Sequence, residues 1–177
     1  MSTLKIKNVV IGEGTPKIIV PLVGKTEEEI LKEAALVKEL APDVVEWRVD
    51  IYEHVEDLEA VKEMISKLRA AFNQELLLFT FRSHKEGGNT EISDAFYVEL
   101  NETAIRTKQI DLVDVELFNE KENVEKLVAA ANENGVFVIM SNHDFFKTPA
   151  KEEIISRLCK MQEYGAHIPK IAVMPQN

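Results

Sequence analysis

The sequence predicts an α/β protein of the (β/α)8 TIM-type barrel class, with an N-terminal β-hairpin and about six of the eight β/α units. Six core strands alternate with helices along the chain, at intervals of roughly 25 to 35 residues, which is typical of a parallel sheet. Polar residues occupy alternate positions near the carboxyl ends of several strands. A barrel gathers such side chains beneath its mouth, whereas an open sheet would press them under helices.

The first part of the chain predicts a hairpin, a core strand and a helix. Two β-rich runs, 5–11 and 17–23, are separated by a segment with two glycines and a proline, so we expect a short hairpin that leads into the first core strand. The helix begins after Thr26, because the Thr26 hydroxyl and the Glu29 side chain form a capping box, and it continues to about Leu40. Its expected apolar face consists of Ile30, Leu31, Ala34, Leu36, Val37 and Leu40.

The rest of the chain repeats the strand and helix order. The further strands are expected at 43–50, 76–82, 111–117, 136–142 and 167–174. The further helices are expected at 57–71, 93–108, 123–134 and 150–164. A glycine-containing loop, 83–90, follows the third core strand, and no low-complexity linker interrupts the pattern. We therefore expect one domain over residues 1–177.

Composition and charge exclude several classes of protein. The chain has 177 residues, of which 45% are hydrophobic, and this is ample for a core. Its net charge of -10 argues against nucleic acid and anionic membranes as partners. The N-terminus shows no long apolar run, so we expect no signal peptide, no membrane span and a cytoplasmic location. The single cysteine, Cys159, is expected to pack on its helix and indicates neither an intramolecular disulfide nor a metal cluster.

Alternation along the second core strand separates a polar side from an apolar one. Glu46, Arg48 and Asp50 share one side, while Val45 and Trp47 share the other. In the later strands the same side carries Leu78, Thr80, Arg82, Asp114, Glu116, Ile139, Ser141, His143, Ile168 and Lys170.

These inward charges have two interpretations. For Asp114 and Glu116 we favour a structural ion network, because buried acidic groups are costly without partners. For Arg48 and Arg82 we favour ligand binding, because a guanidinium near a pocket mouth suits oxygen-rich ligands.

Lys170 is the candidate nucleophile, because it lies in an apolar, β-branched segment that reads as a buried strand. Burial disfavours the ammonium form, and a neutral amine can attack a carbonyl to form a Schiff base. The alternative is a lysine whose stem packs inside while its head reaches water. His143 follows the neighbouring strand on the same side, where it can meet Lys170 and move protons. A carboxylate from the loop 83–90 can reach this histidine.

Six motifs distributed over essentially the whole chain resemble type I 3-dehydroquinate dehydratase, the Schiff-base enzyme of the shikimate pathway. The motifs are Ile11-Gly12-Glu13-Gly14, Glu46-Trp47-Arg48-Val49-Asp50, Phe79-Thr80-Phe81-Arg82-Ser83 with Glu86-Gly87-Gly88, Asp114-Val115-Glu116-Leu117, Ser141-Asn142-His143-Asp144 and Pro169-Lys170-Ile171-Ala172.

The resemblance implies a carbon–oxygen lyase of aromatic amino acid biosynthesis that converts 3-dehydroquinate into 3-dehydroshikimate. It implies that Lys170 forms the imine, that His143 is the general acid and base, and that Glu86 orients His143. The residues that it implies for substrate binding are Glu46, Arg48 and Arg82. The reaction needs no metal or organic cofactor, because the lysine activates the substrate. The expected partners are this small substrate and a second copy of the chain in a homodimer.

The resemblance ends after the sixth core strand, whereas a complete barrel takes about 250 residues. The seventh and eighth units are therefore expected to be absent, together with the family's carboxylate-binding arginine and its closing loop. One alternative is an inactive fragment that serves only as a binding or assembly unit. Another is a metal-dependent barrel enzyme. Its candidate ligands are Glu46, Asp50, Asp114, Glu116 and His143.

Overall fold

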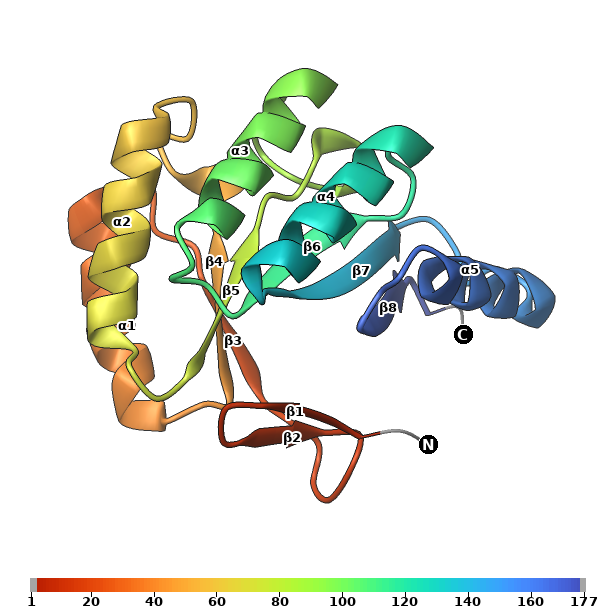
Figure 1. Cartoon of the computed structure of the whole chain (residues 1–177), viewed down its shortest axis with the longest axis horizontal. Helices are drawn as coiled ribbons and strands as arrows, with labels where there is room; N and C mark the ends of the chain where they lie inside the picture. The colour runs from red at the N-terminus through yellow and green to blue at the C-terminus, as the bar shows by residue number, and fades with distance from the viewer. Residues whose placement is uncertain (1–2, 176–177) are drawn as a thin grey trace.

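A curved sheet of six parallel strands forms the centre of the protein (Figure 1). The computed structural model describes residues 3–175, so the two ends of the predicted domain lie outside the described residues. The strands lie side by side in chain order, and the sheet curls like part of a barrel wall. They are β3 (Ile19–Leu22), β4 (Val44–Arg48), β5 (Leu76–Thr80), β6 (Leu112–Glu116), β7 (Phe137–Asp144) and β8 (Ile168–Val173).

A helix follows each strand from β3 to β7, which confirms the predicted repeat. The helices are α1 (Glu27–Leu40), α2 (Leu58–Ala71), α3 (Asp94–Arg106), α4 (Lys121–Asn134) and α5 (Lys151–Glu163). None of them, within residues 3–175, is long and apolar enough to cross a bilayer. Because β3 and β8 each have one strand neighbour in this part of the chain, the sheet is an open portion of the predicted barrel.

The predicted hairpin exists, but its predicted position was wrong. Both of its strands, β1 (Leu4–Ile6) and β2 (Val9–Ile11), come from the first β-rich run, and the second run forms only β3. Lys7 makes the reversal possible with a positive φ of 51°, a conformation that tight hairpin turns require. Lys7 followed by Asn8 is a weaker turn signal than the glycine-containing segment 12–16 that comes next, so the sequence does not mark the position of this turn.

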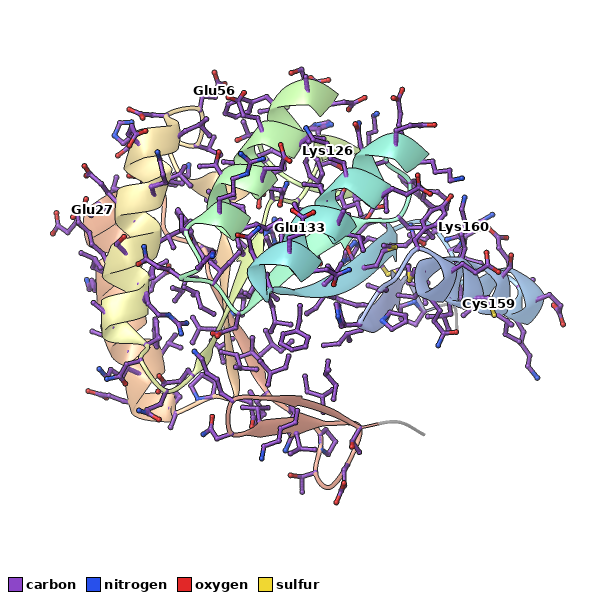
Figure 2. All side chains as sticks on the ribbon, viewed as in Figure 1. Glu27, Glu56, Lys126, Glu133, Cys159 and Lys160 are labelled. Carbon is purple, nitrogen blue, oxygen red and sulfur yellow. The ribbon has the colours of Figure 1, made fainter. Side chains whose placement is uncertain are left out.

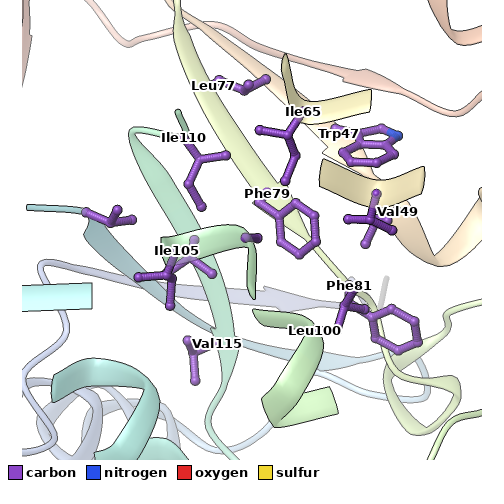
Figure 3. Packing of buried hydrophobic residues seen from close by; sticks show 14 of the residues in the cluster. Trp47, Val49, Ile65, Leu77, Phe79, Phe81, Leu100, Ile105, Ile110 and Val115 are labelled. Carbon is purple, nitrogen blue, oxygen red and sulfur yellow. The ribbon is translucent and has the colours of Figure 1, made fainter. Parts of the chain in front are cut away.

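The outer side of the sheet packs against the helices and forms the larger hydrophobic core (Figure 3). Trp47 of β4 contacts Phe79 of β5 edge to face, with ring centroids 5.7 Å apart. Ile65 brings α2 onto this layer, and Val115 extends it along β6. These residues are the apolar partners of the alternating polar positions, so the predicted division of the strands into two sides is confirmed.

The inner side of the sheet is apolar at one end and polar at the other. Leu78, Leu112 and Ile139 form a second core with Ile6 and Val9 of the hairpin, which lies under the amino-terminal ends of the strands (Figure 1). The charged residues on this inner side lie further along each strand, toward its carboxyl end. The inner core therefore lies beneath the carboxyl ends of the strands. Barrel enzymes have their active sites at these carboxyl ends.

The helix boundaries follow the predicted signals, although two faces differ. The capping box of α1 is present, with the backbone N–H of Glu29 donating to Thr26 Oγ1 over 3.2 Å. Leu36 and Leu40 were expected on the apolar face but are 60% and 70% exposed, because the face that contacts the sheet is narrower than the apolar pattern. Cys159 of α5 is also exposed and not packed as expected (Figure 2). The one buried residue of α5 is Met161.

Candidate active site

Lys170 and His143 lie near the carboxyl ends of two neighbouring strands. Lys170 on β8 stands in register with Ser141 on β7, and His143 follows two residues later opposite Ala172. Lys170 and His143 therefore lie on neighbouring strands and on the same side of the sheet, as the alternation predicted. The expectation that the strand of Lys170 is buried was wrong, and the alternative of a lysine that reaches water stays open. All of β8 is half-buried, because no further strand covers its free side within residues 3–175.

His143 is held by the carboxylate of Glu86. The distance from His143 Nδ1 to Glu86 Oε2 is 2.8 Å, and the two side chains are 11% and 7% exposed. The loop 83–90 was expected to bring a carboxylate to His143, and Glu86 makes this contact. A carboxylate on Nδ1 favours the tautomer with its proton on that nitrogen, which leaves Nε2 free to accept a proton.

Two glycines bring Glu86 to this position. A side chain at Gly88 would lie 1.8 Å from the Arg82 carbonyl oxygen, so the loop can fold back on its own start only with glycine there. Gly87 has a φ of +87°, and the ring of Phe145 occupies the space that its side chain would need. Phe145 also stacks on His143 with an interplanar angle of 16°. The imidazole is therefore restrained at its edge by Glu86 and on its face by Phe145.

Arg82 forms the centre of a buried ion network. Its Nη1 donates to Glu116 Oε1 over 2.7 Å and to Ser141 Oγ over 3.0 Å, and its Nη2 lies 3.0 Å from Asp114 Oδ1. Glu86 Oε2 approaches Nη1 at 3.6 Å. The structural ion network expected for Asp114 and Glu116 is present. Arg82 was expected to bind a ligand, and the structure shows that it is the cation of this network.

The charges in this network are strongly coupled. Burial by itself would lower the pKa of Arg82, but the carboxylates of Asp114 and Glu116 outweigh burial and raise it. Burial raises the pKa of Glu116 above its usual value, against the attraction of Arg82. The arginine is therefore a permanent cation beside the catalytic candidates.

Arg48 is bound differently, at the rim of the sheet. Its Nε and Nη2 each donate over 2.8 Å to the two oxygens of Asp50, which is fully buried. Asp50 also accepts from the backbone N–H of Arg82 over 3.2 Å, which joins the rim to the central network. The hydrogen bond with Asp50 raises the pKa of Arg48. Glu46, two residues earlier on the same side of β4, is half-buried.

Four of the five proposed metal ligands have other partners: three pair with arginines, and His143 pairs with Glu86. Asp50 binds Arg48, whereas Asp114 and Glu116 bind Arg82. Residues 3–175 contain no group of three His, Cys, Asp or Glu side chains placed to hold a metal ion. The metal-dependent alternative thus lacks a ligand cluster in the part of the chain that the structure describes.

Sequence reasoning missed two polar residues near Glu86. Asn142 is buried and donates from Nδ2 to Glu86 Oε1 over 3.2 Å, and Arg157 of α5 donates to Asn142 Oδ1 over 2.7 Å. Strand alternation placed Asn142 on the side away from the site. The run of polar residues from Ser141 to Asp144 at the end of an apolar strand was the available signal.

Comparison with known proteins identifies the family of this chain. A model of the family described as type I 3-dehydroquinase matches residues 18–177. The 3-dehydroquinate dehydratases of Bacillus velezensis and Bacillus subtilis are each 61% identical over the whole of this chain, which covers 70% and 69% of those proteins.

Solved structures show the same arrangement of the chain. Type I 3-dehydroquinate dehydratase from Clostridium difficile, with covalent modified comenic acid, is 52% identical and gives a TM-score of 0.97 over 99% of this chain and 69% of that chain. The 3-dehydroquinate dehydratase from Enterococcus faecalis is 44% identical, with a TM-score of 0.95 over 98% of this chain and 72% of that chain. The chain therefore belongs to the type I 3-dehydroquinase family.

Proposed function

We propose that this chain carries the activity of a 3-dehydroquinate dehydratase and converts 3-dehydroquinate into 3-dehydroshikimate through a Schiff base on Lys170. Membership of the family supports the reaction. The structural observation that carries the proposal is the His143–Glu86 pair, 2.8 Å apart, with His143 on the strand next to that of Lys170. A positioned acid and base beside an amine is the arrangement that imine chemistry needs.

The chemistry proceeds in four steps. The neutral amine of Lys170 adds to the C3 ketone, one proton is taken up from solvent water, and the ketone oxygen leaves as water, so that a protonated imine forms; the final hydrolysis returns that proton to water. His143 Nε2 takes a proton from C2, and the electron pair moves toward the imine, which acts as the electron sink. His143 then returns the proton to the C1 hydroxyl, which leaves as water as the C1–C2 double bond forms. Water hydrolyses the imine and releases 3-dehydroshikimate and free Lys170.

The remaining site residues have supporting roles in this proposal. Glu86 holds the His143 ring so that Nε2 faces the substrate. Arg48 and Arg82 contribute positive charge for the oxygen atoms of the substrate, and Glu46 accepts from its hydroxyl groups. The lysine itself activates the ketone, so this scheme uses no cofactor.

We also propose that the protein acts in the cytoplasm as a homodimer. The free edge of β3 supports association with a second copy, because Ile19 at its start is 43% exposed and the preceding Ile18 is 63% exposed. The single exposed cysteine supports a reducing compartment, since it offers no intramolecular disulfide.

Borohydride trapping tests the central proposal. Incubation with 3-dehydroquinate and borohydride should add the mass of the reduced ligand to the peptide that contains Lys170. Lys170→Met should abolish the adduct, whereas the control Lys160→Met, on the outer surface of α5, should keep it (Figure 2). An adduct elsewhere would refute the assignment of Lys170. Binding of the ligand without adduct or turnover would favour the binding-unit alternative.

A further inference from the structure

The side-chain amide of Asn142 connects the catalytic carboxylate to a guanidinium on α5. Its Nδ2 donates to Glu86 Oε1 over 3.2 Å, while its Oδ1 accepts from Arg157 Nη1 over 2.7 Å. The other oxygen of Glu86 binds His143. An unbroken series of hydrogen bonds thus runs from α5 to the imidazole, through a residue that is only 2% exposed.

The chemistry of the two neighbours determines which way this amide points. A guanidinium has donors and no acceptor, so it must face the amide oxygen of Asn142. An ionised carboxylate has acceptors only, so Glu86 must face the amide nitrogen. Arg157 therefore selects the amide orientation that supplies a donor to Glu86. The opposite orientation would place two oxygens against each other.

Arg157 is itself fixed before any ligand binds. It forms an ion pair with Glu153, one turn earlier on α5, and its guanidinium lies over the ring of Phe118 at 5.3 Å from the centroid. Its side chain is only 13% exposed, although α5 is otherwise a surface helix. These two contacts remove most of the rotamer freedom of Arg157. The entropy cost of ordering its side chain is therefore met in the free protein and does not add to the barrier of the reaction.

We propose that Asn142 and Arg157 are positioning residues that act through Glu86 on His143. This inference rests on the proposed function, because it assigns them to the orientation of the general acid and base. With Oε1 held by Asn142, the Glu86 carboxylate keeps Oε2 in line with Nδ1 of His143. That contact maintains the tautomer in which Nε2 is free to take the C2 proton.

The test compares variants of the whole protein. Asn142→Asp keeps the shape and the contact with Arg157 but removes the donor to Glu86. Arg157→Met keeps most of the stem but removes every donor. Both should lower kcat roughly ten- to a hundredfold, the range for outer partners that orient a histidine, with KM unchanged. Arg157→Lys retains a donor and should recover part of kcat. The matched control is Arg106→Met, whose arginine forms an i,i+4 pair with Glu102 away from the site.

A second readout does not depend on turnover. With ¹⁵N-labelled histidine, the parent protein should show His143 protonated at Nδ1, whereas Asn142→Asp and Arg157→Met should show a mixture of tautomers. Unchanged kcat and an unchanged tautomer in both variants would overturn the inference. His143→Ala is measured in parallel, and normal turnover in that variant would instead refute the proposed function.

Discussion

Arg82 Nη1 lies 2.7 Å from Glu116 Oε1, and both side chains are at most 5% exposed. The same guanidinium contacts Asp114, so one cation compensates two buried carboxylates. Removal of the cation leaves those charges in a medium that solvates them poorly.

Arg82→Met should therefore reduce the free energy of unfolding by roughly 3–5 kcal/mol, the usual cost of breaking a buried pair. Urea denaturation measures this difference. The control Arg106→Met breaks an exposed pair with Glu102 and should change stability by less than about 1 kcal/mol. Similar values for the two variants would show that the Arg82 network contributes nothing special to stability.

His143→Ala should lower turnover of 3-dehydroquinate by roughly a hundredfold to ten-thousandfold, the usual contribution of a positioned acid and base. Imine formation depends more on Lys170, so the variant should accumulate an adduct that borohydride traps. Steady-state kinetics and intact-mass spectrometry measure the two effects. His54→Ala is the control, because His54 is exposed on the surface. Near-normal turnover in His143→Ala would remove this histidine from the mechanism.

Tyr97 should make the protein less stable in alkaline solution. Burial raises the pKa of Tyr97, which is 3% exposed, and its hydroxyl oxygen accepts from the backbone N–H of Glu116 over 3.3 Å. The folded state therefore keeps a proton that the unfolded chain loses above a pH of about 10. Fewer protons bound in the unfolded state mean that stability falls as the pH rises, by up to about 1.4 kcal/mol per pH unit.

The test follows the free energy of unfolding from pH 9 to 11. Tyr97→Phe should be less stable than the parent at pH 9, because the N–H of Glu116 loses its acceptor, but its stability should fall less steeply with pH. Tyr164→Phe is the control, since that ring is only half-buried at the end of α5. Parallel pH curves for the parent and Tyr97→Phe would contradict the assignment.

Periodicity predicted most of the fold, because it reports local and repeating constraints. Alternation along β4 placed Glu46 and Arg48 on the inner side, and the capping box at Thr26 located the start of α1. The same reasoning could not foresee that Arg82 would bind Asp114 and Glu116, since pairing across strands depends on register and rotamers.

Two other errors have a common physical cause. Lys170 and Cys159 were expected to be buried because their segments are apolar. Burial depends on what packs against a segment. Within residues 3–175, β8 is the edge strand of the sheet and α5 is the last helix, so no later element covers them. Asn142 was missed for a related reason, since its partner Arg157 comes from a helix whose docking the sequence pattern does not specify.

The free sides of β3 and β8 lead to the last prediction. Within residues 3–175 each of these strands pairs on one side only, and Ile18 and Ile19 are exposed beside β3. An apolar cavity of about 370 Å³ opens on the inner side, where its lining includes Ile139 and Ile168. Unpaired strand edges next to apolar surface recruit other chains. We therefore expect a protein of these 177 residues to self-associate and to turn over substrate poorly.

Light scattering after size exclusion measures the association. Substitution of Ile18→Lys together with Ile19→Lys should reduce it, because charges on an edge strand oppose pairing. Leu40→Lys is the control, since Leu40 is 70% exposed at the end of α1 and belongs to neither β3 nor β8. The portion of a longer relative that follows the matched region, added as a separate chain, should cover β3 and β8, reduce self-association and raise turnover. A fully active monomer without that addition would show that these edges do not control assembly or activity.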